Sequence, residues 1–135
     1  MKRNNKDKLG IGVIGTGPMG MHHLKGIRIH PRLELKAVCD INIESACAAA
    51  KEYGISSYYS DYRELIARSD IDLVIIATPD HFHSEQTISA LREGKHVLCE
   101  KPMAPTLEEC RAMIAESERT GKKLMIGQIS RYAPS

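Results

Sequence analysis

The sequence predicts an α/β fold: a doubly wound parallel sheet of about six strands in a single domain. Short apolar runs alternate with helical segments along the chain, which is the pattern of repeated strand–helix–strand units. The stretch 72–78 is apolar without polar alternation, as expected for a strand buried on both faces of a parallel sheet. A chain of 135 residues is long enough for one such domain and too short for two ordinary ones.

Residues 9–29 form the first strand–turn–helix unit. The apolar run that ends at Ile14 is followed at once by a Gly-x-Gly-x-x-Gly motif, and helical sequence begins directly after it. The glycines of this motif are Gly15, Gly17 and Gly20. A strand, a tight turn and a helix in this order are typical of a dinucleotide-binding turn, although a bare glycine motif also fits a purely structural turn.

Each part of this turn has a physical role if a dinucleotide binds there. The first glycine allows the sharp reversal, the second allows the main chain to approach a pyrophosphate, and the third allows close packing of helix on strand. Pro18 suits the first helical turn, where its missing N–H costs nothing. The positive end of the helix dipole then faces the phosphates, and we expect Thr16 and Met19 to contact the cofactor too.

The second predicted strand, Leu33–Asp40, ends on an acid 20 residues after Gly20. An acid at this point accepts hydrogen bonds from the adenosine ribose, although Asp40 could also simply begin the next helix. Its carboxylate would repel a 2′-phosphate, and no Arg directly follows, because the next residue is Ile41. The pattern therefore favours NAD over NADP, with Ile41 beside the cofactor.

The rest of the chain continues the alternation. Helices are predicted after the capping residues Asn42, Asp61 and Thr106, and Thr106 forms a capping box with Glu109. Further strands are expected at 57–59, 72–78, 95–99 and 123–129, and further helices at 43–53, 62–68, 82–93 and 107–120.

Composition excludes several classes of function. The formal charge is +2, and the basic start at residues 1–8 is predicted to be a disordered tail rather than a nucleic-acid-binding arm. No apolar run is long enough to span a membrane, and no signal-peptide core follows the basic start. The four cysteines lack metal-binding spacing, so we expect buried thiols, no metal site and a cytoplasmic location.

Right-handed crossovers bring the carboxyl ends of all the strands to one rim, where sheets of this kind bind ligands. The segments that reach this rim are 15–19, Asp40, 78–83, 100–102 and Gln128. We therefore expect a dinucleotide-binding Rossmann domain over residues 9–135, with its site at this rim.

Two motifs on this rim resemble the Gfo/Idh/MocA oxidoreductases, which include glucose-fructose oxidoreductase and inositol dehydrogenase. They are the run 77–83 (Ala-Thr-Pro-Asp-His-Phe-His) and Glu100-Lys101-Pro102. The glycine motif, the position of Asp40 and the closing segment 127–134 are similar to the same family. The resemblance extends in order from Leu9 to Pro134, and Glu-Lys-Pro is its most specific element.

The resemblance implies a nicotinamide-dependent dehydrogenase that acts on a sugar, an inositol or a related polyol. In this family the lysine that matches Lys101 lies beside the nicotinamide, binds the reacting hydroxyl and is joined to Pro102 by a cis bond. The resemblance also implies cofactor contacts, in addition to those above, from Thr78, Pro79, His83, Glu100, Lys101 and Gln128. A metal-binding role for His81 with His83 is disfavoured, because residues i and i+2 point apart at a helix start.

The family normally has more than twice this length, and a second domain carries its catalytic Asp and His and its usual oligomer interface. The chain resembles an isolated cofactor domain of a longer enzyme, or a natural single-domain NAD sensor or regulatory module. A partner-binding subunit is a third interpretation, which retention of Lys101 disfavours. S-adenosylmethionine-binding folds share the glycine turn but have no role for Glu-Lys-Pro. In either of the first two cases we expect cofactor binding without turnover by this chain alone.

Overall fold

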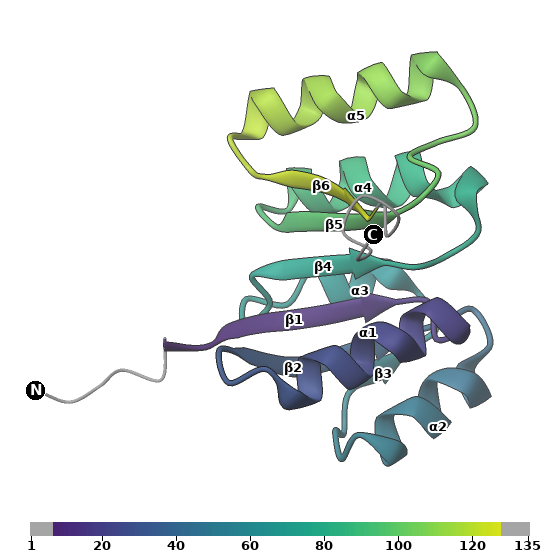
Figure 1. Ribbon diagram of the computed structural model, residues 1–135, viewed down its shortest axis with the longest axis vertical. Helices are drawn as coiled ribbons and strands as arrows, with labels where there is room; N and C mark the ends of the chain where they lie inside the picture. Colours follow the sequence, from purple (N-terminus) through teal and green to yellow (C-terminus); the bar gives the residue numbers. More distant parts are fainter. Residues whose placement is uncertain (1–6, 128–135) are drawn as a thin grey trace, which may run out of the picture.

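The computed structural model describes residues 7–127 and contains a six-stranded parallel sheet in the order β3-β2-β1-β4-β5-β6 (Figure 1). The predicted fold class and strand number are therefore confirmed. The strands are β1 Leu9–Ile14, β2 Leu33–Cys39, β3 Tyr58–Tyr59, β4 Leu73–Ile76, β5 His96–Glu100 and β6 Leu124–Gly127. The α-helices are α1 Pro18–Ile29, α2 Ile43–Glu52, α3 Tyr62–Ile66, α4 His83–Arg92 and α5 Leu107–Thr120.

Strand register brings the ends of the central strands together. At the carboxyl end of β1, Ile14 lies beside Cys39 of β2 and Ile76 of β4, and Ile76 lies beside Cys99 of β5. All four side chains are buried. The loops that follow these strands therefore leave the sheet at the same edge, as parallel pairing requires.

Helices cover the sheet in two layers, because the strand side chains alternate between its faces. On one face, Leu24 and Ile27 of α1 and Ala46 of α2 pack with Val13 and Val38. On the other face, Leu65 of α3, Leu91 of α4 and Met113 of α5 pack with the opposite set of strand residues. Both faces of β4 are thus buried, which explains its uninterrupted apolar sequence.

Most local expectations are confirmed. Asn42 caps α2 by accepting from the Glu44 N–H at 3.1 Å, and Thr106 and Glu109 form the predicted capping box of α5. One helix differs from the expectation for 82–93: residues Asp80–Phe82 form a 3₁₀ turn, and α4 begins only at His83. The N-cap residue Phe82 has an apolar side chain that cannot accept a hydrogen bond from the helix N–H groups. The chain enters α4 through the 3₁₀ turn instead.

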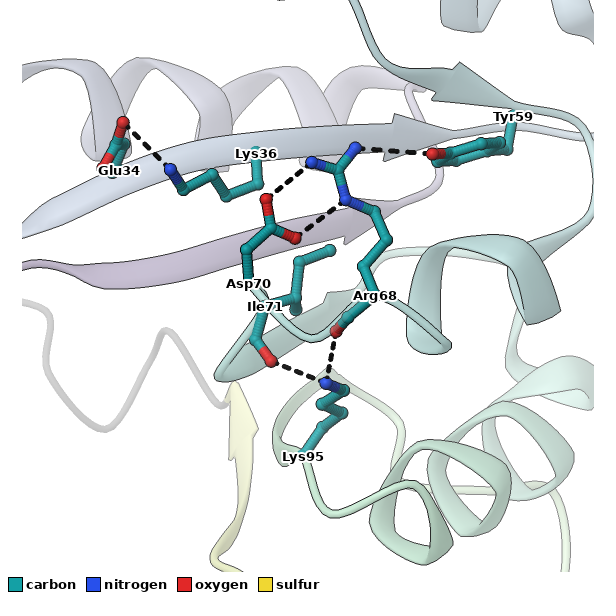
Figure 2. Close-up of polar contacts among 7 residues, drawn as sticks. All are labelled: Glu34, Lys36, Tyr59, Arg68, Asp70, Ile71 and Lys95. Carbon is teal, nitrogen blue, oxygen red and sulfur yellow. Dashed lines mark hydrogen bonds and ion pairs between the residues drawn. The ribbon is translucent and has the colours of Figure 1, made fainter. Parts of the chain in front are cut away.

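The amino ends of the strands carry a polar network of their own (Figure 2). Arg68 donates twice to Asp70, at 2.9 and 2.7 Å, and the buried Lys95 ammonium donates to the carbonyl oxygens of Arg68 (2.6 Å) and Ile71 (2.8 Å). These bonds tie the α3–β4 loop to the start of β5. They lie at the edge opposite the carboxyl ends and so take no part in the candidate site.

Candidate functional site

The glycine turn follows β1 and has the conformation that its sequence requires. Gly15 has φ of 99°, and a Cβ there would lie 2.5 Å from the Ala77 carbonyl oxygen. A Cβ on Gly20 would lie 1.8 Å from the Gly15 carbonyl oxygen. Only glycine fits at these two positions, because a side chain would displace either the turn or helix α1.

Helix α1 begins at this turn. Gly17 is the N-cap and contributes no side-chain hydrogen bond, and Pro18 occupies the first turn as predicted. No atom outside the neighbouring residues lies within 4 Å of an ideal Cβ at Gly17. The space at the Cβ position of Gly17 is therefore open, which leaves room for a group to approach the start of this helix, where N–H groups lack intrahelical partners.

A cavity of about 410 Å³ opens between the loops that follow β1, β2 and β4. Its walls are largely apolar, with Asp40 at the tip of β2 and Ile41 beside it. Its lining includes Ile14, Gly15, Gly17, Cys39, Asp40, Ile41, Ser60, Tyr62, Ala77, Thr78, Pro79, Phe82, Glu85 and Gln86. The structure thus brings six of the predicted cofactor residues, from three separate loops, to one cavity. They are Gly15, Gly17, Asp40, Ile41, Thr78 and Pro79.

The Asp40 carboxylate is fixed at the edge of the cavity by three hydrogen bonds. Oδ2 accepts from the Thr16 N–H at 2.9 Å and from the Thr16 hydroxyl at 2.8 Å, and Oδ1 accepts from the Asn42 N–H at 2.9 Å. A carboxylate has about four acceptor positions, so one position on Oδ1 stays available. Thr16 therefore touches Asp40, a contact that the sequence did not indicate.

The loop after β4 is held from behind by a buried histidine. The Thr78 hydroxyl donates to Gln86 Oε1 at 2.6 Å. The ring of His83 is 1% exposed, with Nε2 2.7 Å from the Thr78 carbonyl oxygen and Nδ1 2.8 Å from the Pro102 carbonyl oxygen. His83 is not among the residues that line this cavity, and the cofactor contact that the resemblance implies for it stays a prediction.

The Glu-Lys-Pro element begins at Glu100, the last residue of β5, on the same rim. Glu100 is buried and its Oε1 lies 2.5 Å from Nε2 of His23 in α1. Lys101 is exposed and forms no hydrogen bond or ion pair with any side chain between residues 7 and 127, and its bond to Pro102 is cis, as the resemblance implied. Gln128 lies outside the described residues, as do residues 1–6 of the predicted tail.

Two of the four cysteine thiols, Cys39 and Cys99, are buried as expected, whereas Cys47 and Cys110 are only half-buried. Burial, with a smaller contribution from the charge of Asp40, raises the pKa of the Cys39 thiol to about 12. Burial also raises the pKa of the Cys99 thiol to about 12.

Within the described part of the chain, no three His, Cys, Asp or Glu side chains gather in a way that could hold a metal ion. No helix between residues 7 and 127 has the length and apolar character needed to cross a membrane.

The fold and the rim are those of a Rossmann domain of the kind that binds dinucleotides. Residues 9–128 match the family model GFO_IDH_MocA, described as the oxidoreductase family with an NAD-binding Rossmann fold. The chain belongs to this family, and its homologues include inositol and sugar dehydrogenases.

Three relatives illustrate the match. Inositol 2-dehydrogenase of Salmonella typhimurium is 36% identical over 124 residues, which cover 90% of this chain and 37% of that protein. Levoglucosan dehydrogenase of Pseudarthrobacter phenanthrenivorans is 40% identical over 113 residues, which cover 78% of this chain and 29% of that protein. The structure of scyllo-inositol dehydrogenase from Lactobacillus casei with NAD(H) and scyllo-inositol superposes with a TM-score of 0.87 at 29% identity. The match covers 93% of this chain and 38% of that one. The chain thus spans well under half the length of these relatives.

Proposed function

We propose that this chain is the NAD-binding domain of a dehydrogenase that transfers hydride between the cofactor and a sugar, an inositol or a related polyol. The observation that carries the proposal is the meeting of the glycine turn, Asp40 and the Thr78–Pro79 loop at one cavity, with Lys101 on the same rim. This arrangement supplies an anion site, a ribose acceptor and a cation for the reacting group.

The residues present fit a dinucleotide. The open space at Gly17 leaves room for a pyrophosphate at the start of α1, and the free acceptor position on Asp40 Oδ1 suits a ribose hydroxyl. The apolar cavity walls suit an adenine ring, and Ile41, 84% exposed, offers an apolar surface beside it. Thr78 and Pro79 also line the cavity.

We infer a preference for NAD over NADP from the charge of Asp40. Three hydrogen bonds hold its carboxylate in place, so it cannot swing away from an incoming 2′-phosphate without losing them. Bringing two negative groups together in a partly enclosed site is unfavourable. No Arg directly follows Asp40 in the sequence to offset this repulsion.

When bound, NAD supplies a nicotinamide ring that accepts or returns a hydride. The role of this chain is to bind the cofactor and to hold the Lys101 ammonium at the rim. An exposed cation stabilises negative charge that develops on a substrate hydroxyl oxygen and lowers the cost of removing its proton. Because Lys101 has no partner among residues 7–127, its charge is available for this purpose.

We expect the 135-residue chain alone to bind cofactor without turning over a polyol. Proton transfer from the substrate needs an acid/base group with a free proton site, and the family resemblance assigns that role to residues of a second domain. Among residues 7–127, both ring nitrogens of the buried His83 contact main-chain carbonyl oxygens, and Nε2 of His23 contacts Glu100. Measurable NAD reduction by the purified chain with a panel of sugars and inositols would contradict this.

Calorimetric titration with NAD⁺ and NADP⁺ tests the proposal. We expect NAD⁺ to bind more tightly, and Asp40→Asn to weaken NAD⁺ binding about tenfold to a hundredfold, because hydrogen bonds to charged groups are worth about 1.5–3 kcal/mol. The matched control is Asp72→Asn, since Asp72 also accepts a main-chain N–H, from Gly10 at 2.8 Å, but lies at the amino end of β4. No heat of binding with either dinucleotide would refute the proposed function.

A further inference from the structure

We propose that His23 and His83 are positioning residues that hold the two neighbours of Lys101, Glu100 and Pro102, and thereby fix the lysine at the nicotinamide end of the site. This inference rests on the proposed function, in which Lys101 acts beside the nicotinamide. Neither histidine touches the reacting atoms in this assignment. Each acts through a neighbour of the lysine.

His23 holds the residue before the lysine. Glu100 ends β5 and is 6% exposed, and its carboxylate has His23 as its one hydrogen-bond or ion-pair partner between residues 7 and 127. Burying a carboxylate without a partner is costly, so the 2.5 Å contact with Nε2 determines where this side chain lies. Gly127 of β6 leaves the space that the carboxylate fills, since a Cβ there would lie 3.1 Å from Glu100 Oε1.

His83 holds the residue after the lysine. Its Nδ1 lies 2.8 Å from the Pro102 carbonyl oxygen, and its Nε2 lies 2.7 Å from the Thr78 carbonyl oxygen. Carbonyl oxygens only accept, so a neutral ring donates to one of the two and a protonated ring donates to both. In either form the ring links the loop after β4 to the loop after β5, and its burial leaves it no alternative partner in solvent.

The two contacts reach the lysine loop from different elements. His23 belongs to α1, the helix that starts at the glycine turn, and His83 begins α4, directly after the 3₁₀ turn that follows Pro79. The Lys101 side chain is exposed and has no polar partner among the described residues, so nothing in its own contacts sets its direction. The main chain on either side must do so, and these two rings connect that main chain to the cofactor-binding loops.

A purely structural role for the histidines predicts a different result from a positioning role. A structural role would weaken the whole cofactor site, whereas a positioning role affects only the nicotinamide end. NADH and ADP-ribose separate these cases, because ADP-ribose contains the adenosine, pyrophosphate and second ribose but no nicotinamide. The measurement is the affinity of the purified chain for each ligand by calorimetry, together with a thermal melt of each variant.

For His23, we expect His23→Leu to lower NADH affinity about twofold to tenfold, the size of one lost hydrogen bond, while ADP-ribose affinity stays within error. His23→Gln keeps a donor near the Nε2 position and should restore NADH binding. His22→Leu is the matched control, because the neighbouring ring is exposed and makes no polar contact with residues 7–127.

For His83, the two amide substitutions separate its two contacts. The amide nitrogen of an asparagine side chain lies near the Nδ1 position, and that of a glutamine lies near Nε2. His83→Asn therefore keeps a donor toward Pro102, and His83→Gln keeps one toward Thr78. We expect His83→Gln to lose more NADH affinity than His83→Asn, by about twofold or more. His83→Gln should also keep its ADP-ribose affinity, because it keeps the contact with Thr78 in the cavity wall.

Equal losses for NADH and ADP-ribose in the His23 and His83 variants would overturn the proposal, as would unchanged NADH binding by His23→Leu. The His23 variants keep the test decisive if the buried His83 does not tolerate substitution, because the His23 ring is partly exposed. If the unmodified chain bound neither ligand, the proposed function itself would fail. Binding of ADP-ribose with a selective loss of NADH affinity supports the proposal.

Discussion

Substituting Gly20 by Ala should destabilise the domain, because helix α1 begins too close to the turn for any side chain. The added Cβ would lie 1.8 Å from the Gly15 carbonyl oxygen and 2.8 Å from its carbon. Ordinary contact would require the main chain to move by more than an ångström, and the obstacle is a turn already held by the Gly15 N–H donating to Cys39 at 2.7 Å. Overpacking typically costs about 1–3 kcal/mol, and a rigid main-chain obstacle places this case at the upper end.

Gly26→Ala is the matched control in the same helix. An ideal Cβ at Gly26 meets no other atom within 4 Å, so only helix propensity changes there, and alanine should stabilise by about 1 kcal/mol. At roughly 4 °C per kcal/mol for a domain of this size, the melting temperature should fall by about 8–12 °C for Gly20→Ala and rise by about 4 °C for Gly26→Ala. Thermal unfolding followed by circular dichroism measures both. If the two variants melted together, the close approach of α1 to the turn would not limit stability.

Gly17→Ala separates folding from binding at the same turn. Gly17 has φ of −73°, which any residue adopts, and its Cβ position is open, so the melting temperature should change by only a few degrees. The new methyl group would occupy the space through which we expect the pyrophosphate to approach. NAD⁺ affinity measured by calorimetry should therefore fall at least about tenfold. Unchanged affinity would mean that the phosphates do not approach this part of the main chain.

Three further predictions concern stability and reactivity. Lys95→Met should cost about 1–3 kcal/mol in denaturant unfolding, because two buried carbonyl oxygens lose their donor. The Arg68 guanidinium lowers the pKa of the Asp70 carboxyl. Because the pair is partly exposed, it stabilises the fold by at most about 1 kcal/mol. This stabilisation is present above the ordinary carboxyl pKa of about 3.9 and is lost as the pH falls through the lowered pKa. The stability difference between the protein and Asp70→Asn should shrink in acid and in 1 M salt. Iodoacetamide at pH 8 should leave Cys39 and Cys99 unmodified in the folded chain, since a pKa of about 12 leaves almost no thiolate, and rapid labelling detected by mass spectrometry would contradict their burial.

Expectations that rest on local pattern agree with the structure most closely. The capping box at Thr106 and Glu109 begins α5 at the predicted residue, and the continuous apolar run of β4 is buried on both faces. Caps and turns involve residues a few positions apart, so their chemistry is visible in the sequence. The 3₁₀ turn before α4 was not predicted. A proline followed by a polar run indicates that a helix starts, but it does not indicate the conformation of the first turn.

One missed contact had a detectable signal. His23 follows Gly20 by three residues and precedes Ile27 by four, so it shares the face of α1 that packs on the sheet. That spacing indicates that the ring points toward the sheet, although it does not indicate which strand it reaches. Its partner Glu100 lies 77 residues away in the chain.

By itself the sequence determined the elements, the parallel sheet and the family, because strand and helix periodicity, glycine turns and caps depend on near neighbours in the chain. The tertiary structure alone decided which groups meet at the rim: Thr16 holds Asp40, His23 meets Glu100 and His83 contacts the Pro102 carbonyl oxygen. These contacts join residues from different strand–helix units. They depend on strand order, twist and the depth of each helix on the sheet, and no local pattern records those quantities.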